Sequence, residues 1–237
     1  MAQESRTSRD EIIRVSVTCL ADFITKPGRS AEKRLRPFKF SKRGEGFARS
    51  SYYQAALKSI RAYHSQGNDI TIFDQSTQEL RALALSENDP RKRTKIEHNI
   101  ETIAAYRKLY SKRRFKVLKN RRLEFPIAGI VVTAQPDLWV EEDGIQVLLK
   151  IGMARHSISY IDLVLSLLRK AAIRSGLKIR ARNFVYLNVS TGREMICSGG
   201  LTRFNSTFSA AAREIAGSWP KIVSEPQSSS DADRPRP

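Results

Sequence analysis

The segment AQPDLWVEEDGIQVLLKIG, residues 134–152, contains the side chains of this chain best suited to chemistry. Asp137 follows a proline, Asp143-Gly144 is typical of a hairpin turn, and Lys150 ends an apolar run. A carboxylate is the hard oxygen ligand that Mg²⁺ prefers. A nearby ammonium group can orient water and stabilise the charge that develops on a phosphate. The segment therefore holds part of what metal-dependent phosphodiester hydrolysis requires.

The predicted elements around this segment resemble the core of the PD-(D/E)xK nuclease-like fold over residues 95–190. Pro136-Asp137 matches the first motif element of that family, and Lys150 matches the lysine of its acid-x-Lys element. The resemblance implies that Asp137 and Lys150 are catalytic, that Asp137 is a metal ligand, and that Mg²⁺ is the cofactor of an active enzyme. Leu148 stands where the family has its second acid. The alternative acids, none at the family position, are Glu97, Glu101, Glu124, Glu141 and Glu142.

Each part of this segment also has an ordinary structural interpretation. An aspartate after a proline is frequent in turns. The sequence EEDG suits a solvated hairpin tip, and Lys150 suits a charge on an edge strand. Only the order of these parts favours the resemblance, because the motif is short and degenerate.

The clustering of positive charge indicates a polyanionic partner. The 237 residues carry a formal net charge of +18. Residues 30–50 contain seven basic and two acidic residues, and residues 91–122 contain thirteen basic and two acidic residues. A basic surface of this kind is the electrostatic footprint of nucleic-acid binding. The candidate nucleic-acid-binding residues are Arg34, Arg36, Lys42, Arg43, Arg91, Lys92, Arg93, Lys112, Arg113, Arg114, Arg121 and Arg122.

Helical patterns dominate the chain up to about residue 118. A capping box at Ser8 and apolar residues at helical spacing predict a first helix that ends at Pro27-Gly28. Residues 30–50 have no sustained period and predict a basic loop. Further helices are predicted over residues 52–64, within 72–85, where ENDP gives a stop signal, and over 95–110.

Strand patterns follow. Residues 123–134 read as one strand bent at Gly129, and residues 137–142 and 145–151 read as a hairpin. A helix then begins at a Ser159–Asp162 capping box and ends at Gly176. Residues 181–197 predict two strands around a Thr-Gly turn, and residues 205–219 predict a closing helix.

The predicted fold class is therefore α+β, with a helical N-terminal half, a β-β-β-α-β nuclease-like core and a C-terminal helix. We expect a helical region over residues 1–90 that includes the basic loop 30–50, a core over 91–222, and a disordered Pro/Ser-rich tail over 223–237.

Three hypotheses of function follow. The first is a nucleic-acid-binding protein whose nuclease-like fold lacks catalysis, and the second is an active Mg²⁺- or Mn²⁺-dependent nuclease with a migrated acid. The third is an adaptor of a mobile-element or defence system that binds an acidic protein. No apolar run of membrane-spanning length and no secretory pattern is present, and Cys19 and Cys197 are too few for a disulfide framework. We therefore expect a cytoplasmic protein without a membrane partner.

Overall fold

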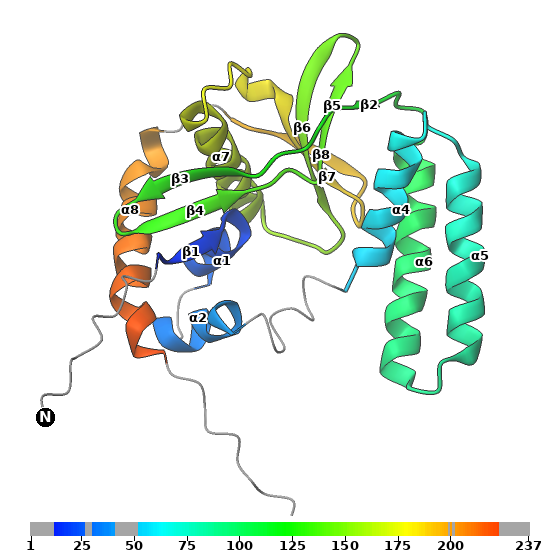
Figure 1. Cartoon of the computed structure of the whole chain (residues 1–237), viewed down its shortest axis with the longest axis horizontal. Helices are drawn as coiled ribbons and strands as arrows, with labels where there is room; N and C mark the ends of the chain where they lie inside the picture. Colours follow the sequence, from blue (N-terminus) through cyan, green and yellow to red (C-terminus); the bar gives the residue numbers. More distant parts are fainter. Residues whose placement is uncertain (1–11, 27–29, 41–51, 199, 201, 223–237) are drawn as a thin grey trace, which may run out of the picture.

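The computed structural model describes residues 12–26, 30–40, 52–198, 200 and 202–222. The first elements in chain order are β1 (Arg14–Ser16), α1 (Val17–Thr25), α2 (Ala31–Lys39), α4 (Gln54–Ser65), α5 (Thr71–Ser86) and α6 (Pro90–Tyr110). They are followed by β2 (Lys116–Val117), β3 (Leu123–Ile127), β4 (Ile130–Ala134), β5 (Leu138–Glu142), β6 (Ile145–Gly152) and α7 (Ile158–Arg174). The last are the 3₁₀ turn η1 (Ala181–Asn183), β7 (Phe184–Asn188), β8 (Arg193–Ile196), α8 (Thr202–Ser218) and the 3₁₀ turn η2 (Trp219–Lys221). The protein is α+β, with most of its strands after its first helices and a helix near the end, as predicted (Figure 1).

The strands form two sheets. The smaller has the order β1-β4-β3, and the larger has the order β2-β5-β6-β7-β8. In the larger sheet β5 and β6 are antiparallel, whereas β6 and β7 are parallel and are connected through α7. The hairpin predicted at Asp143-Gly144 is confirmed, and both residues have the positive φ that such a tight turn requires.

Two predicted elements differ from the structure after residue 120. Residues 123–134 form a β3–β4 hairpin rather than one bent strand, with positive φ at Ala128 and Gly129. The turn was missed because Ala-Gly lacks the Asn or Asp that usually marks it. Helix α7 is capped by Ser157, whose hydroxyl accepts from the backbone N–H of Tyr160, so the capping box predicted at Ser159 is wrong. The predicted end of this helix at Gly176 is confirmed by its positive φ.

The first predicted helix starts later than its pattern indicated. Residues 14–16 form β1, and α1 begins after Ser16, whose hydroxyl accepts from the backbone N–H of Cys19. The strand forms because it pairs with β4, a long-range contact that helical periodicity does not register. The capping box at Ser8 lies outside the described residues.

The predicted loop over residues 30–50 is wrong for residues 31–39, which form α2. Ser30 caps this helix, and Leu35 is fully buried against the core. Pro37 lies inside the helix, where proline ordinarily breaks the pattern, so packing overrides the local signal. Residues 41–51 lie outside the described part of the chain, as does the predicted tail over 223–237.

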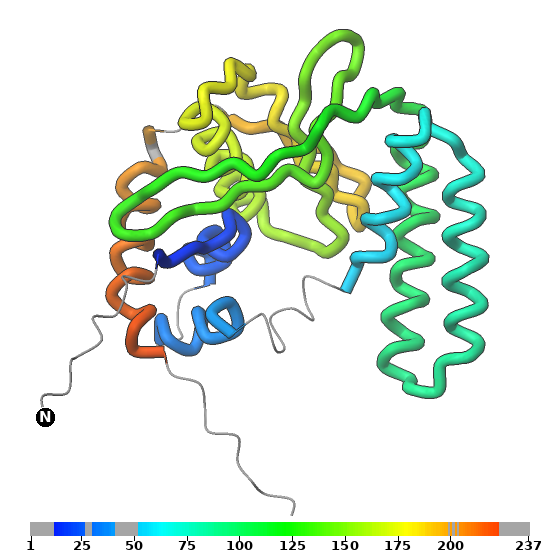
Figure 2. The backbone as a smooth tube through the Cα atoms, viewed as in Figure 1, coloured from blue at the N-terminus to red at the C-terminus, as the bar shows by residue number. Residues whose placement is uncertain are grey.

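Both faces of the larger sheet are covered, and each face belongs to its own apolar cluster. On one face Trp139, Leu148 and Phe184 pack in a cluster with α1, α7, α8 and the smaller sheet. On the other face Val140 and Leu149 pack against α4, α5 and α6, which stand together at one side of the molecule (Figures 1 and 2). Since side chains alternate along β5 and β6, neighbouring residues of each strand enter different clusters. The domain boundary predicted between residues 90 and 91 falls beside the turn between α5 and α6.

Candidate functional site

Asp137 and Lys150 meet at one end of the larger sheet. Asp137 lies just before β5, and the pairing of Leu138 with Leu149 places it beside Lys150 in β6. The Lys150 Nζ atom is 2.9 Å from the Asp137 Oδ2 atom, and the two side chains are only 15% and 12% exposed. Since β6 is an interior strand, the interpretation of Lys150 as an edge-strand charge is wrong.

The Asp137 carboxylate has several donors besides Lys150. The backbone N–H of Ile151 donates to its Oδ2 atom at 2.9 Å. Arg61 of α4 places its Nη2 atom 3.5 Å from the Oδ1 atom, and its Nε–H donates to the Asp137 carbonyl at 2.9 Å. These donors together satisfy the carboxylate and hold it between α4 and β6. A metal ion at Asp137 would have to compete with two cations.

Leu148 shares a sheet face with Lys150, because residues two apart in a strand point the same way. It is fully buried opposite Trp139, in the cluster that includes α7. A carboxylate at this position would lose its hydration in an apolar setting. The residue that the resemblance would require to be acidic is therefore part of the core.

The alternative acids do not gather at Asp137. Lys116 is 3.4 Å from Glu141, Arg113 pairs with Glu142, and Arg122 is 3.1 Å from Glu124. Glu97 and Glu101 are exposed on α6, which packs on the sheet face opposite to Lys150. Within the described ranges, no group of three or more His, Cys, Asp or Glu side chains could hold a metal ion. The second acid that a metal site at Asp137 would need is therefore not supplied by Glu124, Glu141 or Glu142, which pair with other side chains.

Two buried tyrosines extend this site, and the sequence analysis missed both. Tyr186 of β7 is the register partner of Lys150, and Tyr160 lies in the first turn of α7. A Cβ atom at Gly152 would lie 2.3 Å from the Tyr186 hydroxyl oxygen, so glycine is required under the ring. Nothing local could have indicated Tyr186, because it reaches Lys150 only through the parallel β6–β7 pairing.

The surroundings of both phenols raise their pKa values further above the ordinary value of tyrosine. Burial raises the pKa of Tyr186, and the neighbouring Tyr160 and the Asp137 carboxylate raise it further. Burial also raises the pKa of Tyr160, with smaller contributions from Asp22, Cys19 and Asp137. The His156 ring stacks on Tyr160 with the ring centroids 4.4 Å apart, and burial lowers the pKa of His156. Near neutral pH the site thus offers neutral phenol hydroxyl groups beside the Asp137–Lys150 ion pair.

Arg113 and Arg34, two of the predicted nucleic-acid-binding arginines, are held by ion pairs in partly buried positions. Arg113 pairs with Glu142 and, at 2.8 Å, with Glu194, so it links β5 to β8. Its hydrogen bond to Glu142 is the largest cause of its raised pKa. Arg34 lies over the Phe23 ring at 3.7 Å and pairs with Glu214 at 3.1 Å. Both guanidinium groups are therefore engaged within the protein.

The other predicted basic residues lie in three places. Arg36 is half-buried in α2, and Lys42 and Arg43 lie outside the described residues. The first turn of α6 carries three exposed cations: Arg91, Lys92 and Arg93. The rest follow the outer edge of the larger sheet around β2, where Lys116 and Lys119 accompany them. We call this set the cationic edge, and its members are Lys112, Arg114, Lys116, Lys119, Arg121 and Arg122.

A hollow of about 590 Å³ adjoins the cationic edge. Arg114, Lys116 and Lys119 line one side of it, and residues at the end of α4 from His64 to Asn68 line the other. Farther along, the Arg121 guanidinium group lies 5.5 Å from the centre of the Trp139 ring. In the sequence these cations form only a compositional cluster, whereas in the structure they lie along one edge.

No protein-family model matches this chain, and no curated protein matches it. Among the described helices, none has both the length and the apolar character needed to cross a membrane.

Proposed function

We propose that this protein is a cytoplasmic nucleic-acid-binding protein with a degenerate nuclease-like core that lacks catalysis. The observation that carries the proposal is the cationic edge. Lys112, Arg114 and Lys116 are exposed, and the residues between them are turned inward, with Phe115 fully buried. Lys112 lies in the turn after α6, and Arg114 and Lys116 lie two apart in the segment that leads into β2, where an extended chain directs every second side chain to one side at a spacing of roughly 7 Å. Such a row suits the repeating charges of a phosphate backbone.

Most of this charge is available to a partner. Lys112, Arg114, Lys119 and Arg121 form no ion pair with any other residue that the structure describes. Unpaired exposed cations are hydrated and can exchange this water for contacts with phosphates. Each such contact releases counterions that were condensed on the nucleic acid. The proposed affinity is therefore strongly dependent on salt and shows little sequence preference.

The absence of catalysis rests on the surroundings of Asp137. Its carboxylate is held by Lys150, Arg61 and a backbone N–H, and Leu148 is buried in the core. Hydrolysis through Mg²⁺ normally uses two carboxylates, and no group of three or more potential metal-ligating side chains occurs among the described residues. An active nuclease with a migrated acid is the alternative that this geometry supports less well.

The test is a single gel assay of binding and cleavage. Purified protein is incubated with labelled single-stranded DNA, duplex DNA and RNA, first with Mn²⁺ and then with EDTA. We expect binding without cleavage, and a loss of affinity of at least about 100-fold between about 50 and 200 mM salt. The triple variant Lys112→Ala/Arg114→Ala/Lys119→Ala should bind at least about tenfold more weakly.

A control variant carries the same change in charge elsewhere. Arg14→Ala/Arg213→Ala/Lys221→Ala removes three exposed cations from β1, α8 and η2, on the side of the molecule away from β2 (Figure 1). It should bind as the wild type does. Cleavage that requires Mn²⁺ and disappears in Asp137→Ala would replace our proposal with the nuclease. Binding to none of the nucleic acids would overturn it in favour of an acidic protein partner.

A further inference from the structure

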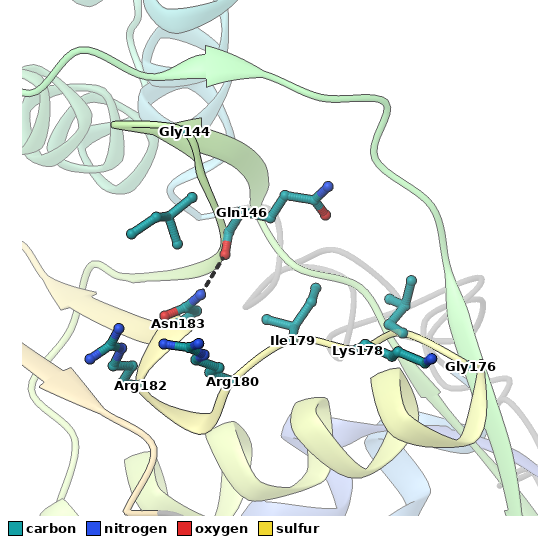
Figure 3. Close-up of a pocket in the computed structure, with 10 residues that line it drawn as sticks. Gly144, Gln146, Gly176, Lys178, Ile179, Arg180, Arg182 and Asn183 are labelled. Atoms are coloured by element: carbon teal, nitrogen blue, oxygen red, sulfur yellow. Dashed lines mark hydrogen bonds between the residues drawn. The ribbon is translucent and has the colours of Figure 1, made fainter.

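A second basic hollow lies at the opposite end of β6 from Lys150. It is a groove of about 670 Å³ between the start of β6 and the connection from α7 to β7 (Figure 3). We call it the hairpin groove, and its lining residues are Gly144–Gln146, Gly176–Arg180, Arg182 and Asn183. Tyr160 and Gly176 mark the two ends of α7, so about 25 Å of helix separates this groove from the Asp137 site. The groove is therefore distinct from that site.

The lining of the hairpin groove combines cations with apolar surface. Lys178, Arg180 and Arg182 lie along the connection, across from the hairpin (Figure 3). All three are exposed, and none forms an ion pair with a residue in the described part of the chain. None of the described lining residues is acidic. On the hairpin side, Ile145 at the start of β6 remains 46% exposed.

The walls of the groove are anchored. The Asn183 side-chain amide donates to the Gln146 carbonyl at 3.0 Å, which ties the connection to β6 (Figure 3). Two acids near the hairpin tip are engaged elsewhere, because Glu141 pairs with Lys116 and Glu142 pairs with Arg113, while Asp143 at the tip is exposed. The positive charge in the groove is consequently little offset by these two acids.

We propose that the hairpin groove binds unpaired nucleotides of a single-stranded nucleic acid. Three cations can contact successive phosphates, while the guanidinium planes and the aliphatic surface of Ile145 can pack against exposed base faces. A duplex keeps its base faces stacked inside and is about 20 Å wide, so it cannot present them to a groove of this size. This inference rests on the proposed function and adds a preference for single strands to it.

The test compares a labelled single strand with a duplex of the same length and measures affinity over a salt series. The groove variant is Lys178→Ala/Arg180→Ala/Arg182→Ala. The slope of log affinity against log salt is negative, and each lost phosphate contact reduces its magnitude by about 0.7 on a single strand, so we expect the magnitude to fall by about 2. Affinity for the single strand should fall at least about tenfold, while affinity for the duplex should change less than about threefold.

The variant Arg14→Ala/Arg213→Ala/Lys221→Ala is the matched control, because it removes the same charge outside the groove. It should keep the wild-type slope, and thermal melting should show that both variants fold. If the groove variant binds the single strand with the wild-type slope, the groove inference is overturned while the proposed function stands. Equal losses on single strand and duplex would overturn the inference as well. Absence of binding by the wild-type protein would overturn both proposals.

Discussion

Removal of the ammonium group from the buried Asp137–Lys150 pair should destabilise the fold measurably. In Lys150→Met the apolar stem is preserved, but the Asp137 carboxylate loses a donor at 2.9 Å while 12% exposed. Loss of one member of a buried pair costs about 3–5 kcal/mol when nothing else compensates. Arg61 and the Ile151 N–H remain near this carboxylate, so we expect about 2–3 kcal/mol.

Urea unfolding at neutral pH, followed by tryptophan fluorescence, measures this loss, since Trp139 lies in the same sheet. The matched control is Lys178→Met, a change at an exposed lysine, which should cost less than about 0.5 kcal/mol. Asp137→Asn completes a double-mutant cycle with Lys150→Met, and the coupling should be at least about 1 kcal/mol.

A Lys150→Met protein as stable as the control would refute the claim that the pair holds this end of the sheet. Coupling near zero in the cycle would refute it equally. The double variant should also keep wild-type affinity for nucleic acid, because the proposed contacts lie on the cationic edge and in the hairpin groove. A large loss of affinity in a folded double variant would place Lys150 in the binding surface instead.

Two further predictions concern Gly152 and His64. Gly152→Ala should lower the free energy of unfolding in urea by about 1–3 kcal/mol, because the added Cβ would meet the Tyr186 ring. Gly217→Ala, which has open space at its Cβ, should be neutral or stabilising by up to about 1 kcal/mol. Equal effects of the two changes would contradict the close approach of Tyr186 to Gly152. Burial lowers the pKa of His64 from 6.5 to about 4. The unfolded chain then binds more protons between these values, so stability is present above pH 6.5 and is lost as pH falls towards 4, by about 2 kcal/mol at pH 5. Urea unfolding of the wild type and of His64→Gln at pH 7.5 and pH 5 measures this difference, and an identical pH dependence in the two proteins would exclude His64 as its source.

Local patterns in the sequence predicted much of the secondary structure. The Asp143-Gly144 turn, the stop before Pro90 and the end of α7 at Gly176 are short-range signals, and the structure confirms them. The failures occurred where long-range packing decides. Residues 14–16 are a strand because β4 lies beside them, and α2 accommodates Pro37 because Leu35 is buried in the core.

The candidate site shows the same division. The sequence singled out Asp137, Lys150 and the absence of an acid at Leu148, because these depend on residue type and on one hairpin. It did not reveal Arg61 or Tyr186, since α4 and β7 reach the site from about 75 residues before and about 35 residues after the hairpin, and no local pattern encodes such a contact.

The sequence by itself determined the chain's α+β class, its strongly basic charge and the lack of a second acid at Leu148, because residue types and short-range periodicity are local properties. Only the tertiary structure decided which cations are used internally, as Arg113 and Arg34 are, and which remain exposed on the cationic edge and in the hairpin groove. A charge is most readily available to a partner when no acid of the protein lies within reach of it. That condition depends on the packing of segments distant in sequence.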